Sequence, residues 1–513
     1  MTNVSSSLDG VLSPGALRTT VEVRPGELVG TAEALFATGF RLALVAAHDE
    51  GAIFRIVYLF TCGPPDRRVE LHLRVDREHP EVPSLAHASF PAGRFEREMR
   101  DLFGIEPVGH PLAHRLVLHQ HWPEGWHPMR HDAGPPPAMV DHAGPYPFVD
   151  VEGTGVYEIP VGPVHAGLIE PGHFRFWVVG ETILKMKARL WFVHKGIERL
   201  FEGADVRSGL ELAERISGDS AVGHGLAYCM AIEDAGGIDV APRAHELRAV
   251  LLELERLYNH VADIGALCND AGFGLANAHA LTLREQLLRL NAEVTGHRLL
   301  RGGVFPGGAR VRRLPRPDEL VEIGERLHAI VDLARSNTIV MDRFTGAAVL
   351  PRAQAEAIGV LGVVARASGL PTDARIEHPF VEPPLAFRPA RQESGDVLAR
   401  FLVRVDEVDA SLALLAEYAG RGGPGSATSG SGEHGPGVGT SGAGGGSGIV
   451  EGWRGTIVHR AEVDTEGLLR RVKVVDPSFG NWPALSVALA DTIVPDFPLA
   501  NKSFNLSYAG NDL

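Results

Sequence analysis

Two short stretches of the sequence each place small polar side chains three residues apart. Ser217 and Ser220 form the first pair, and Ser478 and Asn481 form the second near the C-terminal end. A Cys-x-x-Cys pair in each place would supply four thiolates, which are soft, strong ligands for a transition metal. A serine hydroxyl keeps its proton near neutral pH and is a poor ligand. The spacing therefore indicates the frame of a metal site without its sulfur ligands.

Three further side chains have the chemistry to move protons. Asp219 lies between the two serines, and a buried carboxylate there would have a raised pKa and could relay protons. The alternative is a loop carboxylate that caps a helix together with the serines. His165 and His173 flank a Pro-Gly turn, and an imidazole titrates close enough to neutrality to donate a proton. The alternative is a pair of turn histidines in a chain with 23 of them.

Composition excludes several classes of protein. The 513 residues suffice for two or more domains, and a net charge of -15 argues against a nucleic-acid binder, which needs a basic face. Cys62, Cys229 and Cys268 are far apart and odd in number, so they predict neither a disulfide framework nor a Cys-x-x-Cys metal site. We see no signal peptide and no apolar run long enough to span a membrane.

The fold class expected from the periodicities is α+β. A small α/β domain is predicted over residues 1–135 and a Pro/Gly-rich linker over 136–150. The predicted strands of this domain cover 41–46, 54–60 and 69–75, and its helices cover 31–38 and 95–103.

Residues 151–513 predict a larger, mainly helical domain with β-hairpins and sheets at its edges. Residues 420–448, almost all small or Gly, are expected to form a flexible insert. Residues 493–513 are expected to be irregular. A β-rich segment is predicted over 156–179, strands over 456–459 and 468–475, and helices over 181–201, 207–235, 242–268, 281–300, 319–340, 354–367 and 394–418.

Specific motifs in both domains resemble known families. Phe95 to Ile105 (FEREMRDLFGI), followed by Gly109-His110-Pro111, resembles the signature of the C-type subunit of respiratory complex I. The second domain resembles the D-type subunit of complex I and the large subunits of membrane-bound NiFe-hydrogenases. The fusion of both domains is similar to the large subunits of formate hydrogenlyase and hydrogenase-4. The second domain's matching pieces are Gly162-Pro163-Val164-His165, Gly172-His173-Phe174-Arg175, Val193 to Leu200, Arg215, His224, Arg454-Gly455 and Asp476-Pro477.

The departures from these families are informative. In the hydrogenases, four cysteines hold the nickel–iron centre at the positions of Ser217, Ser220, Ser478 and Asn481, so the resemblance implies vestigial ligand positions and no nickel. Quinone-reducing members place a Tyr in the first loop, where this chain has Gly218. The resemblance therefore supplies no quinone-binding Tyr in this loop.

The resemblance assigns roles to six side chains. His165, His173, Asp219 and His224 would handle protons, and Arg454 would overhang the empty metal position and pair with Asp219 or Asp476. Glu198 lies on a helix near the proton path of relatives, and its alternative is an exposed helical glutamate.

The resemblance also implies a function. The chain would be a subunit of a membrane-associated oxidoreductase complex, peripheral on the cytoplasmic, inner face of the cell membrane. It would bind no cofactor of its own except a quinone. It would take electrons from a 4Fe-4S cluster in a partner small subunit, pass them to the quinone, and couple this transfer to ion translocation by antiporter-like membrane subunits. The alternative is a scaffold subunit that holds the cluster protein against the membrane arm.

Overall fold

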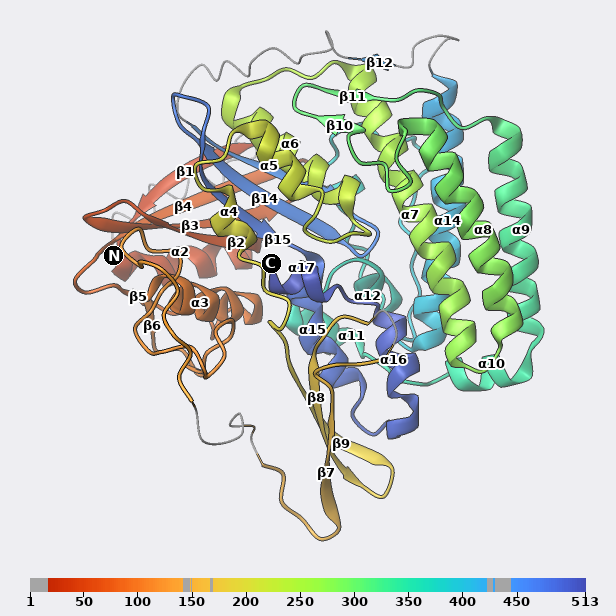
Figure 1. Cartoon of the computed structure of the whole chain (residues 1–513), viewed down its shortest axis with the longest axis horizontal. Helices are drawn as coiled ribbons and strands as arrows, with labels where there is room; N and C mark the ends of the chain where they lie inside the picture. Colours follow the sequence, from red (N-terminus) through yellow and green to blue (C-terminus); the bar gives the residue numbers. More distant parts are fainter. Residues whose placement is uncertain (1–16, 142–147, 149, 167–168, 422–427, 430–443) are drawn as a thin grey trace. The chain divides into compact units, whose positions relative to one another are not determined.

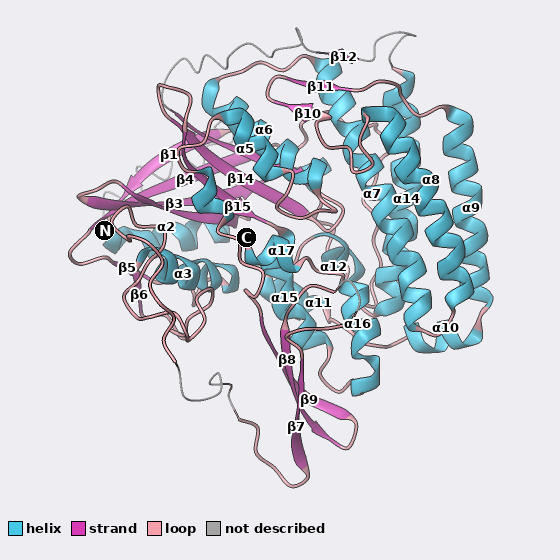
Figure 2. Cartoon of the chain, viewed as in Figure 1, coloured by secondary structure: helices cyan, strands magenta, loops and turns pink. Residues whose placement is uncertain are grey.

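The computed structural model describes residues 17–141, 148, 150–166, 169–421, 428–429 and 444–513. The chain divides into two compact units, of which the first runs to Asp150 and includes Ile376–His378 and Asp512, and the second holds the rest. A sheet dominates the first unit and long helices dominate the second (Figures 1 and 2). The predicted α+β class is confirmed.

The first unit is built on a four-stranded sheet in the order β1-β4-β3-β2. β1 pairs with β4 in parallel, and the other pairs are antiparallel. The predicted strands are all present, and both predicted helices are present with longer N-terminal parts. The elements are β1 (Arg18–Val23), α2 (Pro25–Ala37), β2 (Arg41–Asp49), β3 (Ile53–Cys62), β4 (Arg67–Asp76), β5 (Glu81–Pro83), α3 (Phe90–Phe103) and β6 (Glu106–Val108).

One acidic side chain of α3, that of Asp101, holds the loop that follows the helix. The carboxylate of Asp101 accepts hydrogen bonds from three successive backbone N–H groups, at Leu116, Val117 and Leu118, over 2.7 to 3.1 Å. Gly104 ends α3 in the left-handed conformation with a φ of 71°, which favours glycine. The charged helix in the family signature thus fixes the loop that follows it.

The second unit contains a group of long helices that lie side by side in Figure 1. α7 (Pro242–Asp270) is the longest, with 29 residues, and its apolar positions are buried, as the spacing predicted. The helices predicted over 281–300 and 394–418 are present with shifted ends as α8 (Gly274–Thr295) and α14 (Val397–Gly420). Those predicted over 319–340 and 354–367 are each divided in two, into α9 (Pro317–Ser336) and α10 (Thr338–Phe344), and into α11 (Arg352–Ile358) and α12 (Gly362–Ala367). The short helix α13 (Ala374–Glu377) was not predicted.

The helix predicted over 181–201 is wrong. Residues Thr182–Arg189 form strand β9, and only Ile197–Phe201 forms a helix, α4. Ile183 and Met186 are buried between exposed or half-buried neighbours, a spacing of three that also fits a helix. A register shift in the pairing with β8 allows this spacing in a strand. The three-stranded sheet is completed by β7 (Val156–Val161) and β8 (His173–Val179).

Two other expectations are corrected. Residues 207–235 form two helices, α5 (Val206–Ala213) and α6 (Ala221–Gly236), because the chain turns between them. The tail over 493–513 is largely helical rather than irregular. It forms a 3-10 turn (Val494–Asp496), α16 (Phe497–Phe504) and α17 (Tyr508–Asp512).

The predicted insert over 420–448 is shorter than expected. Gly444–Gly448 belong to strand β13 (Gly444–Glu451), which pairs with β14 (Thr456–Val463) and through it with β15 (Leu469–Val475). Glycine is needed here because β13 lies against α6: a Cβ on Gly448 would stand 2.0 Å from the Ala227 carbonyl oxygen. Thr428–Ser429 pair as β12 with β11 (Gly308–Arg310), which pairs with β10 (Val304–Phe305). The remainder of the insert, and part of the predicted linker, lie outside the described residues.

Candidate functional site

The turn between α5 and α6 brings the first polar pair into the protein interior. Ser220 stands directly before α6, and both Ser217 and Ser220 are buried. The Asp219 carboxylate accepts hydrogen bonds from both hydroxyls, over 2.9 Å from Ser217 and 3.3 Å from Ser220. The indole N–H of Trp453 donates to the Asp219 backbone oxygen and to the Ser220 hydroxyl.

Arg454 forms a two-pronged ion pair with Asp219. Its two terminal nitrogens each lie 2.7 Å from one carboxylate oxygen, so the predicted pairing with Asp219 is present. Arg454 is placed by a tight turn between β13 and β14, and its guanidinium lies 3.9 Å from the centre of the Trp453 ring. Burial opposes ionisation of Asp219, but Arg454 outweighs it and lowers the pKa of the carboxyl. The expected raised pKa is therefore wrong.

The second polar pair lies at the start of α15 (Pro477–Ala488). Asp476 caps this helix by accepting from the Ser478 N–H over 2.7 Å. The Asn481 amide accepts from the Leu361 N–H and donates to its carbonyl oxygen, so both of its polar atoms are used. The Ser478 hydroxyl accepts from the backbone N–H of Ser507, over 2.9 Å.

Ser507, in the tail before α17, connects the two pairs. Its hydroxyl lies 2.8 Å from that of Ser217, while its backbone N–H bonds Ser478. The Gly510 N–H donates to the same Ser507 hydroxyl. The position between the early and the late pair is therefore filled by a side chain of the same chain. Sequence reasoning missed Ser507, because the tail showed no recognisable pattern.

His224, in the first turn of α6, lies in a buried chain of three titratable groups. Its Nε2 is 3.1 Å from Asp476 Oδ2, and its Nδ1 is 3.0 Å from Nε2 of His459 on β14. Burial opposes ionisation of Asp476, but the hydrogen bond and charge of His224 lower its pKa, so the carboxylate accepts from Nε2–H. Between Nδ1 of His224 and Nε2 of His459, one ring nitrogen donates and the other accepts. Such a chain can pass a proton from one imidazole to the next.

Glu255 on α7 is a second residue that sequence reasoning missed. Its carboxyl accepts from the N–H groups of Val222 and Gly223 at the start of α6, over 2.7 and 2.9 Å. Burial raises its pKa to about 8, against the effect of these hydrogen bonds. An acidic residue inside the most regular apolar helix was the available signal, because such a side chain needs a partner.

Glu198 is buried rather than exposed. On α4 it pairs with Arg471 over 2.6 Å and with Lys473 over 3.0 Å, and it accepts from the Val474 N–H, all on β15. Burial opposes its ionisation, but the two cations lower its pKa. Its bonds run to β15 rather than to the Ser217–Ser507–Ser478 group.

His165 and His173 lie at the end of the β7–β8 hairpin, both half-buried. His165 Nε2 is 2.8 Å from the Gly172 carbonyl oxygen, and His173 Nδ1 is 3.3 Å from that of Gly162. Burial lowers the pKa of His173, so this imidazole is mainly neutral at pH 7. Both contacts are made within the β7–β8 hairpin.

The donor set does not fit a nickel site. Ser217, Ser220, Ser478 and Asn481 offer hydroxyl and amide groups that already bond protein partners, and thiolates are absent from these positions. In the part of the chain that the structure describes, no group of three or more His, Cys, Asp or Glu side chains is arranged to hold a metal ion.

Comparison with known proteins gives the family. The family model described as "Respiratory-chain NADH dehydrogenase, 30 Kd subunit" matches residues 21–137, and the one for the "49 Kd subunit" matches residues 270–428. Formate hydrogenlyase subunit 5 of Escherichia coli (strain K12) is 30% identical over 514 residues, covering 96% of this chain and 88% of that protein. The chain belongs to the family of fused complex I C/D-type and formate hydrogenlyase large subunits. The predicted resemblance is thereby confirmed.

Two further similar proteins support this family assignment. Hydrogenase-4 component G of Escherichia coli (strain K12) is 33% identical over 454 residues, covering 85% of this chain and 77% of that protein. In a solved structure of the membrane-bound sulfane sulfur reductase, an archaeal respiratory membrane complex, one chain matches with a TM-score of 0.63 and 25% identity. The match covers 70% of this chain and 99% of that chain. The C/D-type family thus consists of subunits of membrane-bound oxidoreductase complexes. Within the described ranges, no helix is both long and apolar enough to cross a bilayer.

Proposed function

We propose that this chain is a nickel-free large subunit of a membrane-associated oxidoreductase complex. It receives electrons from a 4Fe-4S cluster in a partner small subunit and passes them to a quinone, and the transfer is coupled to ion translocation by membrane subunits. The proposed absence of nickel is supported by Ser507. Its hydroxyl bonds Ser217 and its backbone N–H bonds Ser478, at the position where the hydrogenases would hold the metal.

The hairpin of β7 and β8 supports a quinone near His165 and His173. Both imidazoles are half-buried, and each lies within hydrogen-bond distance of a backbone carbonyl oxygen. A neutral His173 can gain a proton from bulk water and hand it to a reduced quinone oxygen. The proton-handling groups would be these two histidines, with Asp219 and His224 deeper in the unit.

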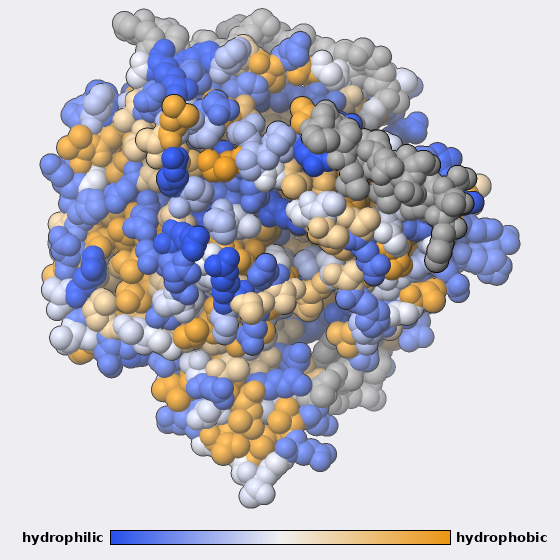
Figure 3. All heavy atoms as spheres, turned by 180° about the vertical axis from the view of Figure 1, so that it is seen from behind, coloured by the Kyte–Doolittle hydropathy of each residue, from blue (hydrophilic) through white to orange (hydrophobic). Residues whose placement is uncertain are grey.

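The same hairpin supports contact with apolar partners. Tyr157, Val179 and Leu184, near one end of the β7–β9 sheet, are 41% to 51% exposed. On the face in Figure 3, hydrophobic residues gather at the lower end, where Figure 1 places this sheet. Exposed apolar side chains in one place are typical of a surface that a partner covers.

A second candidate function is a scaffold that holds the cluster protein against the membrane arm. It is favoured by the same filled position, because side chains rather than an open cavity occupy the space between Ser217 and Ser478. Under this alternative the hairpin histidines are turn residues and carry no protons.

Elemental analysis and a quinone-reduction assay on the purified complex distinguish these functions. We expect iron from the partner's cluster and no nickel above background. His173→Ala should lower quinone reduction by at least tenfold without loss of the small subunit, as expected for a missing general acid. His279→Ala, on the exposed face of α8, is the matched control and should leave the rate unchanged.

Each contrary result has a distinct meaning. Stoichiometric nickel overturns the nickel-free proposal. A rate unaffected by His173→Ala and by His165→Ala removes the quinone role and leaves the scaffold. The scaffold in turn requires that Val164→Asp, which charges the 82% exposed hairpin position, releases the small subunit.

A further inference from the structure

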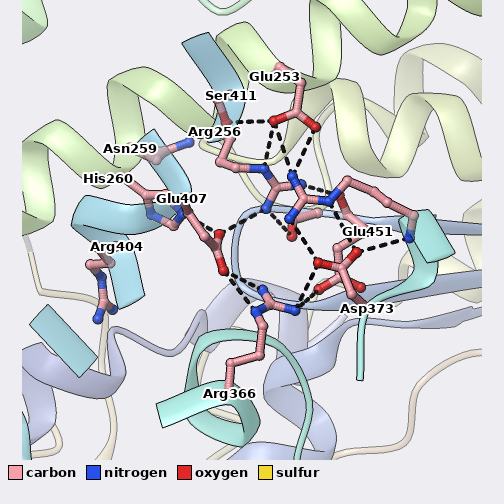
Figure 4. A network of polar contacts seen from close by, with 12 residues as sticks. Glu253, Arg256, Asn259, His260, Arg366, Asp373, Arg404, Glu407, Ser411 and Glu451 are labelled. Atoms are coloured by element: carbon pink, nitrogen blue, oxygen red, sulfur yellow. Dashed lines mark hydrogen bonds and ion pairs between the residues drawn. The ribbon is translucent and has the colours of Figure 1, made fainter. Parts of the chain in front are cut away.

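The core of the second unit contains a buried network of charged side chains (Figure 4). Its members come from α7, α12, α13, α14, the end of β13 and the position directly before α13, and all have side chains at most 8% exposed. None of them belongs to the Ser217–Ser507–Ser478 group. The titratable members are Glu253, Arg256, His260, Arg366, Asp373, Arg375, Glu407 and Glu451.

The charges in this network do not balance. It holds four carboxyl groups but only three guanidinium groups, those of Arg256, Arg366 and Arg375. The neighbouring Arg404 is paired separately with Asp263 over 2.8 Å and leaves the difference unchanged. An uncompensated charge is very costly in a protein interior. One further proton is therefore required, either on His260 or on one of the carboxyls.

The geometry argues against His260 as the carrier of that proton. Its Nε2 lies 2.7 Å from Glu407 and already uses the single N–H of the neutral ring. Its Nδ1 is buried and has no hydrogen-bond partner among the described residues. A second proton would leave a buried N–H without an acceptor, which is unfavourable.

Glu451 is the carboxyl with the least positive charge around it. Glu253, Asp373 and Glu407 each contact two arginines. Glu451 contacts one, Arg366, which bonds its Oε1 over 2.7 Å.

The second oxygen of Glu451 is suited to a proton. Oε2 lies 2.9 Å from the Thr456 hydroxyl and 3.0 Å from the Ala374 N–H. A hydroxyl can rotate from donor to acceptor, so a proton on Oε2 would find an acceptor in Thr456 Oγ1. The three other carboxyls already accept hydrogen bonds from guanidinium groups, so protonation would not stabilise them.

Glu451 is one of the residues that line a small cavity. Its walls are mainly apolar, with Leu252, Phe387 and Tyr418 among them, and Glu253, Arg375 and Glu451 also line it. The cavity volume of about 20 Å³ accommodates one water molecule.

We propose that Glu451 is a proton-binding site in the core of this unit, loaded at neutral pH and exchanging its proton through the adjacent cavity. When loaded, Oε2–H donates to Thr456 Oγ1; when unloaded, the proton has left as hydronium and the Thr456 hydroxyl donates to Oε2. Burial, and next the charge of Asp373, raise the pKa of Glu451 against the effect of Arg366, in agreement with this assignment. The inference does not depend on the proposed function.

Infrared difference spectroscopy of the full chain tests this proposal. The spectrum of the native protein minus that of Glu451→Gln at pH 7 should show the carbonyl stretch of one protonated carboxylic acid per chain. Glu417→Gln, at an exposed position of α14, is the matched control and should show only an ionised carboxylate. Equal near-ultraviolet circular dichroism of all variants establishes that they fold.

A second variant covers the case in which Glu451→Gln does not fold. Thr456→Val removes the acceptor and preserves the side-chain size, so a carboxylic acid band of the native protein should shift to higher frequency. The proposal is overturned if the first difference spectrum contains only an ionised carboxylate, or if Thr456→Val moves no carboxylic acid band.

Discussion

Serine has nearly the size and shape of cysteine, so Ser217, Ser220 and Ser478 can occupy a metal-site frame without disturbing its backbone. What changes is the bonding. A hydroxyl both donates and accepts hydrogen bonds, and here these bonds join Asp219 and Ser507. The serine hydroxyls are buried and hydrogen-bonded, which is the condition for a stable polar core.

Arg454→Gln tests the ion pair at the centre of this group. The variant leaves the Asp219 carboxylate without its cation. Because this carboxylate is 38% exposed and partly screened by water, we expect a loss of about 2 kcal/mol in the free energy of unfolding at pH 7, less than for a fully buried pair. The lowered pKa of Asp219 means that this contribution is present above the ordinary aspartate pKa of about 4 and is lost as the pH falls through the lowered value. Urea unfolding at pH 7 and at pH 3 measures both effects.

Arg421→Gln is the control for this variant, because its pair with Glu417 is largely exposed and should change stability by less than about 0.5 kcal/mol. If Arg454→Gln behaves like Arg421→Gln, the Asp219 pair does not stabilise the fold.

Glu255→Gln should change how stability depends on pH. The folded pKa of about 8 lies above the unfolded value of about 4.3, so the folded state holds one more proton between these pH values. The stabilising contribution is full below about pH 4.3 and is lost as the pH rises through about 8. Gln mimics the protonated carboxyl and does not titrate. The melting temperature of the variant minus that of the native protein should therefore increase from pH 5 to pH 9. Parallel melting curves across this range would contradict the raised pKa.

At the scale of elements, the packing of β13 on α6 depends on glycine. A Cβ on Gly448 would stand 2.0 Å from the Ala227 carbonyl oxygen and 2.9 Å from the Ala231 nitrogen, which are helix backbone atoms that cannot move alone. Gly448→Ala should therefore cost about 3 kcal/mol or more in thermal or urea unfolding. On the same strand, a Cβ on Gly445 meets the flexible end of Arg460, so Gly445→Ala should change stability by less than about 1 kcal/mol. Equal effects of the two substitutions would disprove the close contact.

These two elements also show what the sequence can and cannot predict. α7 is predictable because its apolar residues repeat at helical spacing along one long stretch. β13 was assigned to a flexible insert because its glycines look the same as those of the low-complexity run before it. Only the helix packed against it explains why glycine is required, and that helix lies more than 200 residues earlier.

The candidate site, too, could be predicted only in part from the sequence. The positions of Ser217, Ser220, Ser478 and Asn481 stand out by their spacing and by resemblance. The partners His459, Glu255 and Ser507 come from a strand, a helix and a tail whose proximity depends on the tertiary fold. The pKa shift of Asp219 was predicted in the wrong direction. Burial was taken as the main effect on this pKa, and the ion pair with Arg454 as only one possibility.

At the scale of the whole molecule, the tail of the second unit joins segments that are far apart in the chain. The Asn505 carbonyl accepts from Arg454, Ser507 bonds Ser217 and Ser478, and the Ala509 N–H donates to Glu170. Opening of the tail alone would expose buried groups of the turn before α6 and of α15 at the same time. We therefore infer that the tail opens only together with the unit.

Native-state hydrogen exchange tests this inference and bears on both proposed functions. The amides of Ser507 and Gly510 should exchange with the same free energy of opening as buried amides in the middle of α7, because each bonds a side chain that is itself buried. The amides of α10, a short helix with an exposed outer face, serve as the control for local opening and should exchange faster. If Ser507 and Gly510 exchange as fast as α10, the tail opens locally and the space between Ser217 and Ser478 becomes accessible. That result would favour a small molecule at this position and weaken the scaffold alternative, whereas slow exchange would keep quinone chemistry at the hairpin of His165 and His173.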